Sequence, residues 1–205
     1  RGSGKSYSKD VPRESMTLDQ FVSDTRELSE YLIERFNQDN IFLMGHSWGS
    51  LLGTITAFRH PELFKAYFGI GQVANQFEGE RIGYEWVKQQ AMERNDKKAI
   101  KTLSRLSFPD SLAGSDLWLD YMTKQRQYVN KYGGVTTREI TGMWPLISIV
   151  LKTREYTVRD KLNFMVGSMF SLRAMWDEVI HTNLFKEIDS MQLPVYILHG
   201  VHDYT

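Results

Sequence analysis

One pentapeptide constrains this chain more than any other feature. Gly45-His46-Ser47-Trp48-Gly49 follows the apolar run 41–44 and precedes a helix-compatible stretch, 50–59, that ends at His60-Pro61. A G-x-S-x-G pattern in this context is typical of a sharp turn from a strand into a helix. Glycines on both sides of the serine let strand and helix approach without a clash of Cβ atoms. We therefore expect a strand over 41–44 and a helix over 50–59.

Such a turn gives its serine an unusual position. The strained backbone holds the Ser47 hydroxyl at the carboxyl edge of a sheet, where it is a candidate nucleophile. The backbone amide of the next residue, Trp48, can then point at a developing oxyanion. The alternative is an ordinary serine in a glycine-bounded turn. The predicted strand before Ser47 and the predicted helix after it instead favour a nucleophile elbow, which is the name for such a turn when its serine is the nucleophile.

The flanking sequence predicts an α/β fold. Thr17 and Gln20 form a predicted capping box for an amphipathic helix over 18–36, with an apolar stripe at Leu18, Phe21, Val22, Leu28, Leu32 and Phe36. A second strand is predicted over 66–70. Strands that alternate with helices indicate a parallel sheet with crossover helices.

The chain changes character after residue 74. Residues 75–188 contain helical patterns, including 115–131 and 157–181, with breaks at Pro109, Gly133-Gly134 and Pro145. Strand character returns only at 194–198. We therefore predict an α/β core over 1–73 and 189–205, and an inserted helical cap over 74–188.

Composition narrows the class of partner. The 205 residues carry no formal net charge, which favours neither nucleic acid nor an anionic membrane surface as a partner. There is no cysteine, so disulfides, thiol nucleophiles and cysteine-ligated metals are excluded, as suits a cytoplasmic protein. The longest apolar run, 143–151, is too short to span a bilayer. We expect no cofactor and no metal, and a small-molecule or short-peptide substrate.

Two further segments contain residue patterns that are found at functional sites. The tail Gly4-Lys5-Ser6 matches a phosphate-binding loop, but a preceding strand and an earlier glycine are missing, so nucleotide binding is not predicted. Asp203 follows the strand ending at 198–199, where α/β folds place functional groups. A serine nucleophile needs a base and an orienting acid, in the chain order serine, acid, histidine. Asp203 is therefore the candidate acid, with a simple turn-terminating role as the alternative.

These motifs carry a resemblance. The segment Arg1-Gly2-Ser3-Gly4-Lys5-Ser6, the elbow at 45–49 and His199-Gly200-Val201-His202-Asp203 resemble α/β-hydrolases of the proline iminopeptidase-like group. The resemblance implies a serine nucleophile at Ser47 and a catalytic acid at Asp203. It also implies two parts outside this chain: a second oxyanion donor before Arg1 and a catalytic histidine after Thr205. We therefore expect a fragment that, expressed alone, is insoluble or partly folded and inactive.

None of the five histidines is predicted to be the base. The chain order disfavours each of them, and the best internal candidate is His202. Substrate selection is expected in the cap. Its candidates are four tryptophans and five acids: Trp86, Trp118, Trp144, Trp176, Glu78, Glu80, Glu85, Asp177 and Glu178. A tryptophan-glutamate signature of strict proline iminopeptidases is not found, because Glu85-Trp86 runs in the opposite order.

Two functions of different class follow. The leading hypothesis is a serine hydrolase that acts through an acyl-enzyme on a small ester, amide or N-terminal peptide bond. The alternative is a non-catalytic protein of the same fold that binds a small molecule under its cap. An epoxide hydrolase or dehalogenase of this fold needs an aspartate nucleophile, and position 47 is serine.

Overall fold

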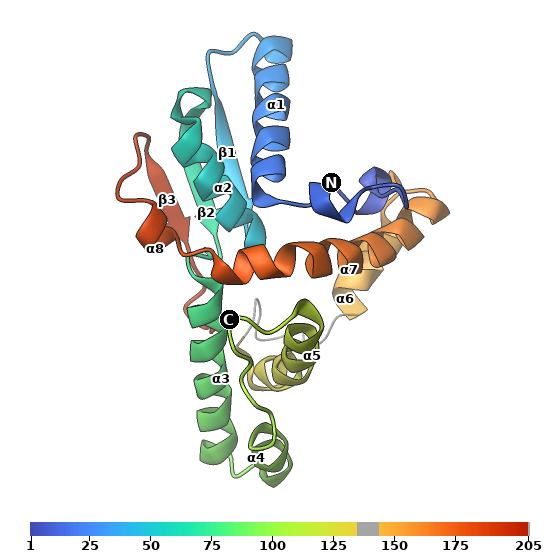
Figure 1. Ribbon diagram of the computed structural model, residues 1–205, viewed down its shortest axis with the longest axis vertical. Coiled ribbons are helices and arrows are strands. Elements are labelled where there is room, and N and C mark those ends of the chain that lie inside the picture. The colour runs from blue at the N-terminus through green and yellow to red at the C-terminus, as the bar shows by residue number, and fades with distance from the viewer. Residues whose placement is uncertain (135–143, 205) are drawn as a thin grey trace.

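The computed structural model describes residues 1–134 and 144–204. Three parallel strands form one sheet in the order β1-β2-β3, and the helices between β2 and β3 lie largely beyond one end of that sheet (Figure 1). The elements are η1 Gly4–Ser6, η2 Arg13–Ser15, α1 Leu18–Phe36, β1 Ile41–His46, α2 Trp48–Arg59, η3 Pro61–Leu63, β2 Phe64–Ile70, α3 Gln76–Glu93, α4 Lys97–Leu103, α5 Ser115–Tyr132, α6 Trp144–Lys152, α7 Val158–His181, α8 Leu184–Glu187 and β3 Val195–Leu198.

This architecture confirms the predicted α/β class with parallel strands. β1 extends two residues past the predicted 41–44, because its pairing with β2 continues to His46 opposite Ile70. β2 begins at Phe64 rather than at residue 66. The predicted break at Pro145 lies at the start of α6, where Pro145 is the second residue and a proline is tolerated. The division of the chain into core and cap stays a prediction.

α1 begins as predicted but is less buried than predicted. Thr17 caps it by accepting a hydrogen bond from the Gln20 backbone N–H, at 3.2 Å. The Gln20 side chain donates to Asp24 instead of returning to Thr17, so the capping box is only half formed. The predicted apolar stripe is buried in its first turns, whereas Leu28 and Phe36 near its other end are 57% and 62% exposed.

The sheet is covered on one face. α2 packs its Ala57 against Tyr67 of β2, and Ile41 and Leu43 of β1 join this cluster. The alternate residues point to the opposite face, as the two-residue period of a strand requires. There Phe42 is 65% exposed and meets Phe68 edge to face.

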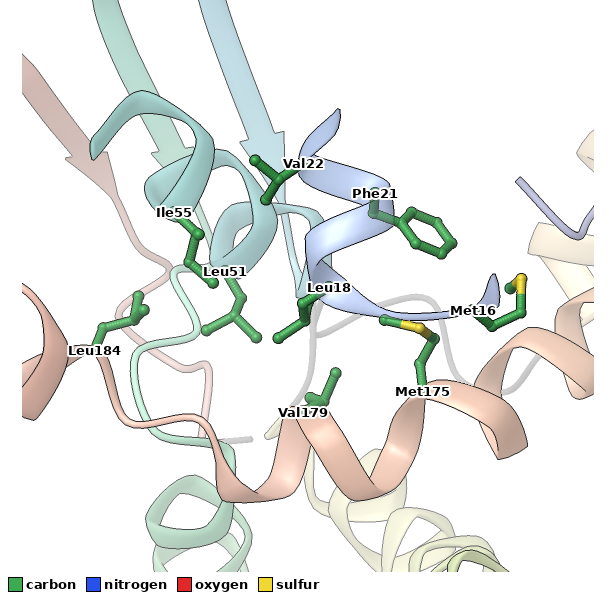
Figure 2. Close-up of a cluster of buried hydrophobic side chains, with 9 residues drawn as sticks. All are labelled: Met16, Leu18, Phe21, Val22, Leu51, Ile55, Met175, Val179 and Leu184. Carbon is green, nitrogen blue, oxygen red and sulfur yellow. The ribbon is translucent and has the colours of Figure 1, made fainter. Parts of the chain in front are cut away.

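α7 lies between the sheet, with its helices α1 and α2, and the helices α3, α4 and α5 (Figure 1). Figure 2 shows its Met175 and Val179 pointing toward Leu18 of α1 and Leu51 of α2, and all four side chains are buried. A capping box at Thr157, reciprocated by Asp160, begins this helix. Within residues 1–134 and 144–204, no helix is both long and apolar enough to cross a membrane.

The turn between β1 and α2 is the elbow that the sequence predicts. Ser47 has φ 55° and ψ −131°, in a region that non-glycine residues rarely adopt. A Cβ on Gly45 would lie 2.4 Å from the Gly49 carbonyl oxygen and 2.8 Å from the Ser50 Cα, so only glycine fits at position 45. A Cβ on Gly49 would meet nothing within 4 Å. The expectation that both glycines relieve a clash is therefore wrong for Gly49, because that residue already lies in the first turn of α2 with open space beside it.

The two glycines provide a matched pair for a stability test. Gly45→Ala is expected to lower the free energy of unfolding by about 1–3 kcal/mol, because the new methyl group overlaps rigid backbone atoms. Gly49→Ala is expected to raise it by roughly 0.5–1 kcal/mol, since alanine is the better helix former. Urea unfolding of both variants measures the difference. Equal effects of the two substitutions would contradict the proposed strand–helix contact.

Candidate active site

The carboxyl ends of the three strands bring the candidate residues to one edge. His46 pairs with Ile70, and Ile70 pairs with Leu198, so the strands end in register. The Ser47 N–H donates to the Ile70 carbonyl at 2.9 Å. Ser47 is exposed, directly before the N-terminus of α2. The elbow therefore presents its hydroxyl at the edge where α/β folds place their functional groups.

A buried serine that the sequence analysis missed holds this turn together. The Ser50 hydroxyl donates to the Ser47 carbonyl at 2.6 Å and accepts a hydrogen bond from the Val73 N–H at 2.9 Å. The Tyr67 hydroxyl donates to the Ser50 carbonyl at 2.7 Å. Ser50 thus joins the elbow to the segment after β2. A serine directly after the pentapeptide, in the first turn of a helix, was the available signal.

Trp48 lies where an oxyanion donor is expected. It is the first residue of α2, and the first N–H groups of a helix have no partner within the helix. Its side chain packs edge-on against Phe21 of α1, with ring centroids 5.3 Å apart. This contact joins the first turn of α2 to α1.

Asp203 lies beside the end of the central strand. Its Oδ2 is 3.8 Å from the position that a Cβ on Gly71 would occupy, and the Gly71 N–H donates to the Leu198 carbonyl. Gly71 has φ 55°, which suits glycine. The Asp203 side chain is 18% exposed, and its Oδ2 is 3.9 Å from His199 Nε2. Ser47 and Asp203 therefore flank the same end of β2, at residues 70–71.

The structure pairs no histidine with the serine. Among the described residues, the Ser47 hydroxyl makes no hydrogen bond. His60 lies near Glu62, His181 Nδ1 contacts the Asp177 carbonyl, and His199 lies near Asp203. His46, within the elbow, is exposed. The general base stays unassigned within the described chain.

The acid-bearing loop is anchored on the inserted helices. Tyr204 stacks on Trp86 of α3, with ring centroids 4.6 Å apart and planes 8° apart. The Tyr204 N–H donates to the Gly134 carbonyl at 3.1 Å. Trp86, a predicted pocket residue, therefore supports the loop that carries Asp203.

A cavity of about 520 Å³ joins the elbow to the inserted helices. This volume is within the range of small-molecule sites in proteins. Its lining comes from the N-terminal loop, α1, the elbow, α3, α5 and α7, and consists of Arg1, Ser3, Phe21, Ser47, Trp48, Gln76, Glu80, Met122, Arg126, Ser168, Ser171, Leu172, Met175, Trp176 and Val179.

Glu80 is the polar centre of this cavity. Its side chain is fully buried, and its Oε1 accepts hydrogen bonds from Gln76 Nε2 at 2.7 Å and Arg126 Nη2 at 2.6 Å. Its Oε2 is also buried but has no partner among the described residues. Burial, and then the negative charge of Glu80, raise the pKa of the Tyr121 hydroxyl. The cavity therefore contains a carboxylate with one occupied and one unpartnered oxygen.

The charges on the N-terminal side of the cavity are already paired. Arg1 donates from Nε and Nη2 to the two carboxylate oxygens of Asp24, at 2.6 and 2.7 Å. This bidentate contact lowers the pKa of Asp24. The hydroxyls of Ser3 and Ser168 are 3.0 Å apart. The phosphate-loop-like residues Gly4–Ser6 form one short 3-10 turn, not the start of a long helix.

The structure separates the predicted cap residues. Glu80 is the one predicted acid in the described cavity lining. Glu78 and Glu85 form ion pairs with Arg81 and Lys88 on their own helix. Glu178 accepts a hydrogen bond from the Leu18 N–H, and Asp177 is exposed. Among the tryptophans, Trp176 lines the cavity and Trp118 is buried behind it. The side chain of Trp144 lies outside the described residues. Arg126 was missed by sequence reasoning, because a lone arginine on a helix gives no signal.

Comparison with known proteins identifies the family of this fold. A model of the alpha/beta hydrolase fold family matches residues 1–203. "Probable aminopeptidase YbaC" of Bacillus subtilis is 32% identical over 206 residues, which cover 99% of this chain and 62% of that protein. "Putative proline iminopeptidase" of Mycoplasma genitalium is 40% identical over 68 residues, 33% of this chain and 20% of that protein.

A solved structure supports the fold. The crystal structure of VinJ matches with a TM-score of 0.50 and 13% identity, over 100% of this chain and 63% of VinJ. The chain thus spans less than two thirds of the length of both YbaC and VinJ. The elbow, the parallel sheet and the match over residues 1–203 lead to one conclusion. The chain belongs to the alpha/beta hydrolase fold family.

Proposed function

We propose that the protein is a serine hydrolase that acts through an acyl-enzyme at Ser47 on a small ester, amide or N-terminal peptide bond. The observation that carries this proposal is the cavity that Ser47 and the buried Glu80 line together. The names of two relatives, an aminopeptidase and a proline iminopeptidase, support a peptide substrate with a free amino terminus.

The elbow supports the chemical step. The Ser47 hydroxyl oxygen bonds to the substrate carbonyl carbon, and its proton passes to a histidine that Asp203 orients. The Trp48 N–H stabilises the oxyanion that forms. Collapse of this intermediate expels the alcohol or amine, which takes up the proton, and leaves an acyl group on Ser47. Water then hydrolyses that ester and restores the serine.

Glu80 supports selection of an amino terminus. Leaving a buried carboxylate oxygen without a hydrogen-bond donor costs free energy, so a donor in the bound substrate is favoured. Arg126 and Gln76 both contact Oε1, which leaves Oε2 as the available acceptor. A protonated amine supplies charge and donors together. We therefore assign the substrate ammonium to Glu80 Oε2.

The first test concerns the nucleophile. A fluorophosphonate probe is expected to label the full-length protein at Ser47, and Ser47→Ala is expected to abolish both labelling and hydrolysis of 4-nitrophenyl acetate. Peptide mass spectrometry locates the adduct. Labelling of Ser50 or of another serine contradicts the assignment. Absence of labelling, together with retained ligand binding, favours the non-catalytic binding protein.

The second test concerns the acid. Asp203→Asn is expected to lower kcat by about a factor of 10⁴, because the base loses the carboxylate that orients it and stabilises its charge. Steady-state kinetics on the ester measure the loss. Near-normal turnover would assign the acid role to another residue. Asp177→Asn, an exposed acid on α7, is the control and is expected to leave kcat unchanged.

The third test concerns the ammonium. Glu80→Gln is expected to lower kcat/KM for alanine or proline 4-nitroanilide by roughly 10–100-fold, the worth of a hydrogen bond to a charged group. Hydrolysis of 4-nitrophenyl acetate, which has no amine, is expected to change little. Glu78→Gln is the matched control, since Glu78 lies on the same helix but has a side chain that is 43% exposed and paired with Arg81. Equal losses of kcat/KM for the anilide and for the ester would indicate a structural role for Glu80. Thermal melting of both variants checks that they fold.

A further inference from the structure

A second buried polar atom in the cavity lining has no partner. Trp176 of α7 is 5% exposed, lines the cavity with Ser47 and Glu80, and has an indole Nε1 without a hydrogen-bond acceptor among the described residues. Tryptophan donates through this one N–H and cannot accept. Buried donors in native proteins are nearly always satisfied. Unlike Trp118, which also has an unpartnered Nε1, Trp176 lines the cavity, so a molecule bound there can supply the acceptor.

We propose that Trp176 is a specificity-determining residue whose indole N–H binds an uncharged oxygen acceptor on the acyl side chain of the substrate. This inference rests on the proposed function, which places the other two polar groups of the substrate. The ammonium belongs to Glu80, and the reacting carbonyl oxygen belongs to the Trp48 amide. The acceptor for Trp176 must therefore come from the side chain of the acyl residue.

Three other hydroxyls and one arginine of the cavity lining already have partners. The hydroxyl of Ser3 contacts Ser168, and that of Ser171 donates to the Gly2 carbonyl. Arg126 is held by Glu80 and by the Gln125 carboxamide oxygen. Among the described lining residues, Trp176 Nε1 is thus the one buried side-chain donor that has no partner.

The charges of the cavity favour an uncharged acceptor. Its two arginines are each paired with a carboxylate, Arg1 with Asp24 and Arg126 with Glu80. A substrate carboxylate would find only the neutral indole as its donor, in a cavity that also holds the negative charge of Glu80. A hydroxyl or a carboxamide oxygen needs no counter-charge. Threonine and asparagine therefore fit better than aspartate or glutamate as the acyl residue.

The indole is held in place from behind. Trp176 packs against Trp118 with ring centroids 5.8 Å apart, in a cluster with Tyr121 and Ile180. Trp118 also has a buried Nε1 without a partner, but it is absent from the described lining of the cavity. Trp118→Phe is therefore a matched control for Trp176→Phe. Both substitutions remove one N–H and keep an aromatic ring.

Binding is measured apart from catalysis, in full-length protein carrying Ser47→Ala. Calorimetry compares threonine amide with valine amide, which have nearly the same shape, and asparagine amide with leucine amide. We expect the oxygen-bearing amide of each pair to bind at least about tenfold tighter, since a missing acceptor leaves a buried donor unpaired. Trp176→Phe is expected to reduce both ratios to about one, and Trp118→Phe to leave them unchanged.

A second measurement does not depend on the folding of a variant. Protein labelled with ¹⁵N at tryptophan gives one indole N–H signal for each tryptophan side chain. Threonine amide is expected to shift the Trp176 signal and leave that of Trp118 in place, while valine amide shifts neither. Equal affinities within both pairs, or ratios that survive Trp176→Phe, overturn the inference. A preference for threonine amide alone supports the inference and identifies a hydroxyl as the acceptor. A preference for asparagine amide alone supports it and identifies a carboxamide. If the fluorophosphonate probe does not label Ser47, the proposed nucleophile is wrong. The affinity ratios still test the role of Trp176, because they are measured without catalysis.

Discussion

The contact between the end of β1 and the first turn of α2 is the constraint on which the site depends. Gly45 lets the Gly49 carbonyl approach so closely that no side chain fits between them. This approach leaves a single residue, Ser47, to turn the chain, and it does so with a positive φ. Such strain of about 1–3 kcal/mol persists only where the surroundings fix the geometry. Here Ser50 fixes it, because its hydroxyl and carbonyl hold the elbow, β2 and the following segment together.

α7 joins the core that holds the elbow to the helices on the other side of the cavity, because it packs on both. Met175 and Val179 pack on the core that carries α1 and α2, whereas Trp176 and Ile180 pack on Trp118 and Tyr121. Residues one position apart on a helix point about 100° apart, so one helix serves two cores. Figure 2 shows the first of these faces. The serine and the polar residues of the inserted helices are thus positioned against the same element, although they are far apart in the sequence.

Local patterns predicted the elements well, and the elbow best of all. The 18–36 helix, the strand that follows it and the late strand at 195–198 were recovered, because each depends on periodicity and on capping within a short window. The same reasoning could not rank the acids. Glu78 and Glu80 lie two positions apart on one helix, but Glu80 is fully buried and paired with Arg126 of α5, whereas the Glu78 side chain is 43% exposed. Trp118 and Trp176 likewise look equivalent in sequence, and tertiary contacts alone place one of them in the cavity lining. The catalytic roles of Ser47 and Asp203 stay predictions.

The buried pair of Glu80 and Arg126 is hard to explain as a device for stability. Removing two charges from water costs several kcal/mol per ion, which their attraction offsets only when the remaining hydrogen bonds are satisfied. Here Oε2 of Glu80 is not satisfied within the described chain, and Trp176 Nε1 beside the same cavity is not satisfied either. An apolar lining at these positions would fold with less penalty. In the proposed function, Glu80 Oε2 accepts from the ammonium of the ligand, and Trp176 Nε1 donates to an oxygen of its side chain. An amino acid with a polar side chain offers both groups. In the function proposed above, the helices between β2 and β3 select the substrate, and the elbow supplies the nucleophile.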